Sequence, residues 1–185
     1  MRRILPSILS AAAFAFCGLI ADAQGQTVTA RGANVAAPAG AATSLPLTLP
    51  NKEGSVRFVA IGDTGTGTEQ QHELARLMVN YRRTFPYEFV LMMGDNMYGG
   101  EKPADFKAKF ENVYQELLDN KVTFYASLGN HDESNQRFYD HFNMKGEEYY
   151  RIKKGNVAFY ALDSNYMDKR QLKWFEDELA KDDSE

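Results

Sequence analysis

The stretch Gly94-Asp95-Asn96-Met97-Tyr98 follows an apolar run at residues 88–93 with a carboxylate, and it places a phenol three residues further on. The apolar run is rich in β-forming residues and predicts a buried strand. Two other strand-like runs end in a similar way. Residues 56–61 lead into Gly62-Asp63-Thr64-Gly65, and residues 122–128 lead into Gly129-Asn130-His131-Asp132. An oxygen-bearing side chain therefore follows each of three predicted strands.

Two helices are predicted between these strands. The first begins near Thr68 and has apolar residues at helical spacing: Leu74, Ala75, Leu77, Met78 and Tyr81. The second opens at Pro103 and has an apolar stripe: Phe106, Phe110, Val113, Tyr114, Leu117 and Leu118. The alternation of strands and helices indicates parallel βαβ units in an α/β fold. Because ligands bind at the carboxyl ends of parallel strands, we expect Asp63, Asp95 and Asn130 to converge there.

The remainder of the chain predicts three further elements. A short helix is expected at about residues 134–142. A β-hairpin is expected from residues 149–153 and 156–162, joined at Lys154-Gly155. A last amphipathic helix is expected at residues 169–180, with a buried apolar set: Leu172, Trp174, Phe175 and Leu179.

The first 23 residues have the composition of an export signal. Arg2 and Arg3 precede an apolar run at residues 4–21, and Ala21-Asp22-Ala23 is a small-x-small cleavage site. An uncleaved transmembrane anchor is the competing interpretation, but Pro6 and the small residues favour a signal. We expect a periplasmic or secreted protein without a stable membrane anchor. Residues 24–54 read as a flexible leader of Ala, Gly, Pro and Thr, and residues 55–185 as the folded domain.

Composition excludes several kinds of site. The length of 185 residues and 44% hydrophobic content allow one domain with a real core. The formal net charge of −4 is mixed in sign along the chain and does not favour nucleic acid as a partner. The only cysteine, Cys17, lies within the expected signal, so the mature chain has no disulfide, thiolate ligand or cysteine nucleophile. Any metal must be held by oxygen and nitrogen.

The oxygen-bearing side chains suit a hard cation. Carboxylates, a phenolate and an amide oxygen favour iron(III), manganese, magnesium or zinc. His131 directly follows Asn130, so its imidazole can lie at the rim of the site and act on a leaving oxygen.

Simpler interpretations remain open for each residue. Asp and Asn are common in turns, Tyr98 can be a packed aromatic, and His131 can be a surface group. His72 and His141 have no partner motif and are assigned to the surface or to packing. The loop at residues 62–67 can also be read as a phosphate-binding glycine loop, but it lacks the G-x-G-x-x-G spacing and has no following Gly-Lys-Ser/Thr.

The three sequence blocks resemble the first three blocks of the calcineurin-like metallophosphoesterases, and more narrowly those of the purple acid phosphatase branch. The wider family usually has Asp-x-His in its first block, where this chain has Gly65. The purple branch instead uses a tyrosine after the second aspartate, which Tyr98 matches. The resemblance implies a metallophosphoesterase α/β sandwich and a binuclear centre of iron(III) and a divalent ion (Fe, Zn or Mn).

The resemblance also implies a role for each matched residue. Asp63 and Tyr98 would bind iron(III), Asp95 would bridge both metals, Asn130 would bind the divalent ion, and His131 would be catalytic. Residues 149–151 and 162–164 also look like family stretches, but Asp163 is expected to be structural. Further histidine ligands would come from blocks beyond a helix like residues 171–175, including a Gly-His-x-His. The sequence to Glu185 has no such block. We therefore expect an N-terminal fragment with the C-terminal strands missing.

The function implied by this resemblance is phosphoester hydrolysis. The full-length protein would be an acid phosphatase that hydrolyses small-molecule phosphate monoesters through a metal-bound hydroxide, and the fragment alone would be inactive. The alternative is a non-catalytic binding or interaction protein that keeps the fold with an incomplete metal site. The sequence does not predict which ester is the substrate, nor the oligomeric state.

Overall fold

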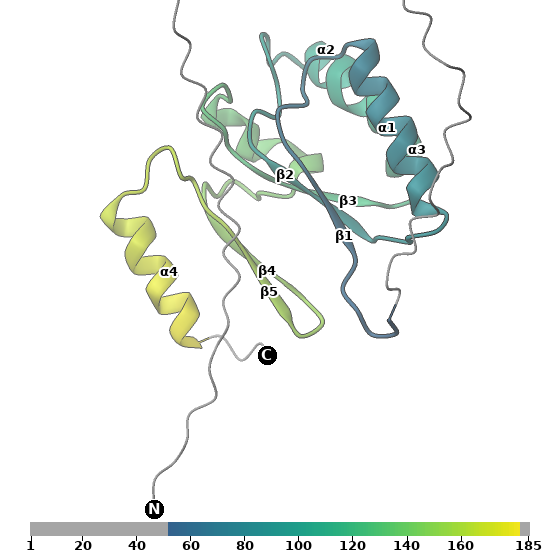
Figure 1. Ribbon diagram of the computed structural model, residues 1–185. Helices are drawn as coiled ribbons and strands as arrows, with labels where there is room; N and C mark the ends of the chain where they lie inside the picture. The colour runs from purple at the N-terminus through teal and green to yellow at the C-terminus, as the bar shows by residue number, and fades with distance from the viewer. Residues whose placement is uncertain (1–51, 182–185) are drawn as a thin grey trace, which may run out of the picture. The chain divides into compact units, whose positions relative to one another are not determined.

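The computed structural model describes residues 52–181, so the expected signal and nearly all of the leader lie outside the described residues. Three parallel strands form a sheet in the order β1-β2-β3: β1 (Phe58–Ile61), β2 (Phe89–Met93) and β3 (Thr123–Ser127). Figure 1 labels each of them. Phe58 pairs with Phe89, which pairs with Thr123. The predicted parallel core of the α/β fold is therefore confirmed.

The burial of each strand follows from its place in the sheet. The central strand β2 reads Phe-Val-Leu-Met-Met, and its first two residues are fully buried because the strand is covered on both faces. In β3 the buried and half-buried residues alternate, as expected for a strand whose two faces differ in cover.

Helices α1 (Glu69–Arg82) and α3 (Asn112–Asp119) lie side by side on one face of the sheet (Figure 1). The predicted second helix is interrupted: α2 (Pro103–Phe106) passes through a π-helical turn, η1 (Lys107–Glu111), into α3. The apolar stripe predicted for this helix is buried, except that Leu118 is only partly covered. Its buried members are Phe106, Phe110, Val113, Tyr114 and Leu117.

Only part of the apolar set of α1 is buried. Ala75 and Met78 are buried, but Leu77 and Tyr81 are 53% and 52% exposed. Leu77 is two residues from Ala75, which places it about 200° around the helix, and Tyr81 lies one turn beyond Leu77. Both side chains therefore lie away from the sheet.

The expected hairpin is confirmed as β4 (Tyr150–Lys154) and β5 (Val157–Ala161), with the turn at Gly155 and Asn156. It packs against the parallel sheet on the face opposite α1 and α3 (Figure 1). The Phe159 ring lies edge-on to Phe58 and Phe89, at centroid distances of 5.1 and 5.4 Å. The Tyr150 hydroxyl also donates to the Ala126 carbonyl of β3 at 2.6 Å.

Helix α4 (Lys169–Lys181) covers the outer side of this hairpin (Figure 1). Trp174 packs on Tyr149 and Phe175 on Tyr160, with ring centroids 5.0 and 5.1 Å apart. The expected burial of Leu172 and Leu179 is wrong, because they are 46% and 49% exposed. The hairpin covers the stripe formed by the two aromatic residues and leaves the leucines at its margins.

The expected helix at residues 134–142 is a pair of 3₁₀ helices, η2 (Ser134–Phe138) and η3 (Asp140–Phe142), separated by the extended backbone of Tyr139. Asp163 is structural, as expected, because its carboxylate accepts the backbone N–H groups of Asn165 and Tyr166. None of the helices between residues 52 and 181 has both the length and the apolar character needed to span a bilayer.

Candidate metal centre

The loops that follow β1 and β2 extend the pairing of the two strands. The Asp63 N–H donates to the Gly94 carbonyl at 3.1 Å, and the Thr64 N–H donates to the Asp95 carbonyl at 3.2 Å. Asp63 and Asp95 both adopt left-handed backbone conformations, with φ of 56° and 51°. Aspartate tolerates this conformation better than most residues. The segments after β1 and β2 therefore both turn at an aspartate as they leave the sheet. This brings the two carboxylates to the same edge of the sheet.

Two glycines allow the three loops to approach closely. A Cβ atom on Gly65 would lie 1.9 Å from the carbonyl oxygen of Asn96, and one on Gly129 would lie 2.1 Å from Oδ1 of Asp95. Neither position has room for a side chain. In this backbone the close approach at Gly65 excludes the histidine that the wider family usually has there.

The Tyr98 phenol joins the two carboxylates. Its hydroxyl lies 3.1 Å from Oδ1 of Asp63 and 2.9 Å from Oδ2 of Asp95. The backbone of Tyr98 is held as well, because its N–H donates to the Gly65 carbonyl and its own carbonyl accepts from Lys109 Nζ. The pKa of Tyr98 is raised above its ordinary value. Partial burial of the phenol is the largest cause, and the hydrogen bonds to the two carboxylates add to it. The phenol is therefore a neutral donor here.

The loop after β3 closes the third side of the site. The His131 N–H donates to Oδ1 of Asp95 at 3.2 Å, and its ring lies 5.3 Å from the Tyr98 ring, centroid to centroid. Asn130 and His131 are both exposed. The structure thus brings Asp63, Asp95, Tyr98 and His131 into one contact network, with Asn130 beside it in the same loop as His131.

The donor set fits part of a metal site. Two carboxylates and a phenol converge at hydrogen-bonding distance, and none of the ion pairs among residues 52–181 includes Asp63 or Asp95. The uncompensated negative charge of the two carboxylates favours a hard cation. If Tyr98 bound this cation as a phenolate, the cation would replace the phenol proton. The same residues contain no group of three His, Cys, Asp or Glu side chains able to hold an ion. The described residues thus bring oxygen-bearing side chains together without a set of histidines around them.

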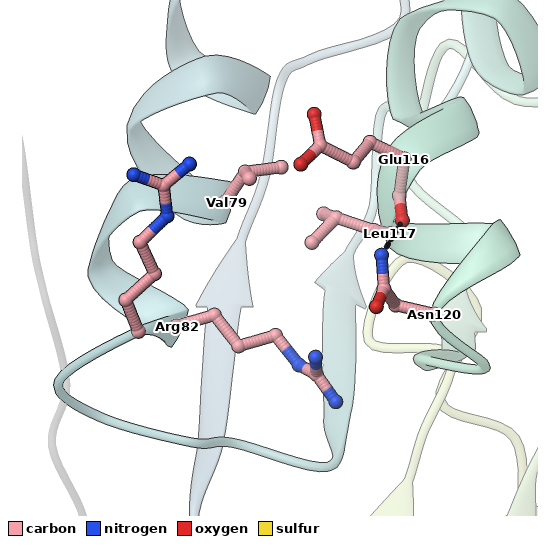
Figure 2. A pocket seen from close by; sticks show the side chains of 6 residues that line it. Val79, Arg82, Glu116, Leu117 and Asn120 are labelled. Carbon is pink, nitrogen blue, oxygen red and sulfur yellow. Dashed lines mark hydrogen bonds between the residues drawn. The ribbon is translucent and has the colours of Figure 1, made fainter.

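A cavity elsewhere in the molecule does not belong to this centre. A cavity of about 180 Å³ lies between the C-terminal ends of α1 and α3 and is lined by Val79, Arg82, Arg83, Glu116, Leu117 and Asn120. Figure 2 draws these side chains from close by. Helix α1 ends at Arg82, and residues 83–88 connect it to the start of β2; within this connection Arg82 Nε donates to the carbonyl of Tyr87. The cavity therefore lies at the amino ends of the strands, opposite the loops that carry Asp63 and Asp95.

Asp132 and Gln136 were not among the residues singled out from the sequence. Asp132 accepts backbone N–H groups from Asn96, Met97 and Gly129, and the fully buried Gln136 donates to it. Only the position of Asp132 beside His131 could have indicated a role. The hydrogen-bond partners of Asp132 come from segments about 35 residues apart, which no local pattern reveals.

The sequence profile of the calcineurin-like phosphoesterases matches residues 56–183, and the chain belongs to this family. The family implies a metal centre, and oxygen-bearing side chains lie at the strand ends.

Individual relatives place the chain near the purple acid phosphatases, as the resemblance implied. The chain is 38% identical over 88 residues to "Purple acid phosphatase 4" of Arabidopsis thaliana, covering 45% of this chain and 26% of that protein. It is 33% identical over 144 residues to "Tartrate-resistant acid phosphatase type 5" of Oryctolagus cuniculus, covering 64% and 44%. The chain thus spans less than half the length of these relatives. A solved structure titled "GAP50 the anchor in the inner membrane complex of Plasmodium" matches with a TM-score of 0.46 and 21% identity, over 67% of this chain and 48% of that one.

Proposed function

We propose that the complete protein is an acid phosphatase that hydrolyses small-molecule phosphate monoesters at a binuclear centre of iron(III) and a divalent ion (Fe, Zn or Mn). The observation that carries the proposal is the Tyr98 hydroxyl, which hydrogen-bonds to Asp63 and Asp95 at the ends of two parallel strands. The names of the purple and tartrate-resistant acid phosphatase relatives support the same activity.

Each residue has a role in this proposal. Asp63 and Tyr98 would hold iron(III), Asp95 would bridge the two ions, and Asn130 would hold the divalent ion. When bound, the two metal ions supply an activated water and positive charge that stabilises the phosphoryl group. His131 lies exposed beside Asp95, where its imidazole can give a proton to the leaving oxygen.

Iron(III) titration tests the ligand roles on this chain. We expect a visible absorption band from charge transfer between the Tyr98 phenolate and iron, and its loss in Tyr98→Phe. Tyr81→Phe is the matched control, because Tyr81 is half exposed on α1 and lies outside the centre. A band that persists in Tyr98→Phe would contradict the assignment of Tyr98.

Hydrolysis of p-nitrophenyl phosphate by the complete protein tests the activity. We expect Asp95→Asn to lower turnover by about a hundredfold or more, because a bridging ligand loses its charge. Asp119→Asn, an exposed carboxylate at the end of α3, should leave turnover unchanged. Undiminished turnover in Asp95→Asn would refute the bridging role.

The alternative is a non-catalytic binding or interaction protein with an incomplete metal site. The observation in its favour is that residues 52–181 contain no group of three His, Cys, Asp or Glu side chains around one point. For the same reason we propose that this part of the chain alone has little or no turnover. A complete, metal-loaded protein that shows neither hydrolysis nor the absorption band would favour the alternative.

Export belongs to the same proposal. The charged start, apolar run and small-x-small ending of residues 1–23 support cleavage after Ala23 and a periplasmic or secreted destination. N-terminal sequencing of the protein recovered from its native compartment tests this, and an intact Met1 would contradict it.

A further inference from the structure

The Asp132 carboxylate accepts hydrogen bonds from five N–H donors. Its Oδ2 accepts from the Asn96 backbone N–H at 3.0 Å, from Asn96 Nδ2 at 3.0 Å and from the Gly129 N–H at 2.8 Å. Its Oδ1 accepts from the Met97 N–H at 3.0 Å and from Gln136 Nε2 at 2.7 Å. Both oxygens are therefore saturated by donors, as expected for a structural carboxylate.

These donors belong to the segments that carry the candidate ligands. Asn96 and Met97 lie between Asp95 and Tyr98 in the loop after β2. Gly129 directly precedes Asn130 in the loop after β3. One carboxylate thus connects two loops that leave neighbouring strands, and it does so at the residues adjoining the candidate ligands on each side.

The surroundings hold Asp132 in one orientation. Gln136 and Asn96 are fully or almost fully buried, and Asn96 Nδ2 also donates to the Ser127 carbonyl at 2.8 Å. Gln136 in turn donates to Oε1 of Glu101 at 2.6 Å, and the same oxygen accepts the Glu133 N–H. The network therefore extends from the strand ends to η2, and Asp132 is its common acceptor.

We propose that Asp132 is a positioning residue that fixes the loop at residues 94–98 against the loop at residues 129–131. Its carboxylate sets the separation of Asp95 and Tyr98 from Asn130 and His131. We call this connection between the two loops the clamp, and it rests on the five hydrogen bonds of Asp132. The ligand roles of the residues that it positions rest on the proposed function.

Asp132→Asn is the sharpest test because the substitution keeps the size of the side chain. In either amide orientation the new NH₂ group faces N–H donors where a carboxylate oxygen stood. Glu101→Gln is the matched control. It also removes a carboxylate charge from this network, but the hydrogen bonds that Glu101 accepts come from Glu133 and Gln136 and not from Asn96, Met97 or Gly129.

Two measurements on the 185-residue chain decide the matter. Amide hydrogen exchange by NMR should accelerate by about tenfold or more at Asn96, Met97 and Gly129 in Asp132→Asn, and stay unchanged in the β4–β5 hairpin. The affinity for Mn²⁺ should fall by about tenfold in Asp132→Asn and change by less than about threefold in Glu101→Gln.

Several results would overturn the inference. Unchanged hydrogen exchange at the amides of Asn96, Met97 and Gly129 would show that Asp132 does not hold the two loops together. Faster exchange with unchanged Mn²⁺ affinity would reduce Asp132 to a purely structural residue, as would equal losses of affinity in Asp132→Asn and Glu101→Gln. A wild-type chain that binds no Mn²⁺ would instead count against the proposed metal function, and faster exchange in Asp132→Asn would still support the clamp.

A second variant covers the case in which Asp132→Asn does not fold. Gln136→Met keeps the approximate length of the side chain and removes its amide group, which donates to Asp132 and Glu101 and accepts from Asn96 Nδ2. Asp132 then loses one of its five hydrogen bonds. We expect faster exchange at the Met97 amide, which shares Oδ1 with Gln136, and a smaller effect at Gly129. Unchanged exchange at both amides would contradict the proposed network.

Discussion

The two ends of the three-stranded sheet are built from different kinds of polar contact. At the carboxyl ends, side chains bond across loops that are distant in sequence, as in the contacts of Tyr98 with Asp63 and of Met97 with Asp132. At the amino ends, around the cavity in Figure 2, Arg82 donates to the carbonyl of Tyr87 and Asn120 to that of Glu116, each within five residues.

This difference shows what the same parallel topology provides at each end. Both ends carry charged and amide side chains, but only the carboxyl end has left-handed aspartates and glycines without room for a Cβ atom. Those backbone features bring oxygen atoms from separate loops together. At the amino end the polar side chains satisfy nearby carbonyls and create no shared site. We therefore expect substitutions at the carboxyl end to lower the free energy of unfolding more than substitutions at the amino end.

The largest contrast is expected between two glycines in the same loop. Gly65→Ala places a Cβ atom against the Asn96 carbonyl and should cost more than about 3 kcal/mol of unfolding free energy, or prevent folding. Gly62→Ala would meet its nearest atom, Cβ of Met93, at 3.6 Å and should change stability by less than about 0.5 kcal/mol. Urea unfolding measures both variants. Equal stability of the two would show that the loops separate easily.

A smaller contrast is expected between two asparagines at opposite ends of the sheet. Asn96→Ala removes a buried amide that bonds to Ser127 and Asp132 and should cost about 2–3 kcal/mol, because buried acceptors lose their donor. Asn120→Ala removes an exposed bond to the Glu116 carbonyl and should cost about 0.5 kcal/mol. Denaturant midpoints provide the comparison, and a larger loss in Asn120→Ala would reverse our ordering of the two ends.

The smallest effect concerns the amino end alone and depends on pH. Burial raises the pKa of Tyr87 to about 12, partly offset by Arg82. Above pH 10 the unfolded chain releases this proton while the folded chain keeps it, so stability present below pH 10 is lost as pH rises towards 12. Tyr87→Phe should cost about 1 kcal/mol at pH 8, through the lost bond to Met78, and reduce the alkaline loss. Unfolding at pH 8 and pH 11 checks this, and the same alkaline slope in both proteins would refute it.

The fold was largely predictable because its signals are local. Apolar runs of strand length, a proline at the start of a helix and stripes at helical spacing all lie within short windows. The hairpin and α4 were found in the same way. The exposure of Leu179 was not predictable, because spacing indicates a helix without showing how much of its apolar stripe the neighbouring hairpin covers. The π-helical turn at Lys107–Glu111 also left no recognisable pattern.

The candidate site was predictable only in outline. The parallel order placed Asp63 and Asp95 at one edge, and the structure puts a Tyr98 hydroxyl between them. The roles of Asp132 and Gln136 were out of reach, because a carboxylate that accepts five donors looks in sequence like any acidic residue. The ligand assignments themselves stay predictions that the metal titrations test.

The sequence distances in the site have a consequence for the order of events during folding. The contacts of Tyr98 with Asp63 and of His131 with Asp95 close loops of 35 and 36 residues, whereas the β4–β5 hairpin closes through a two-residue turn. Long loops close more slowly because more chain entropy is lost before a contact forms. When the whole chain folds, we therefore expect the contacts of Tyr98 with Asp63 and of His131 with Asp95 to form after the β4–β5 hairpin.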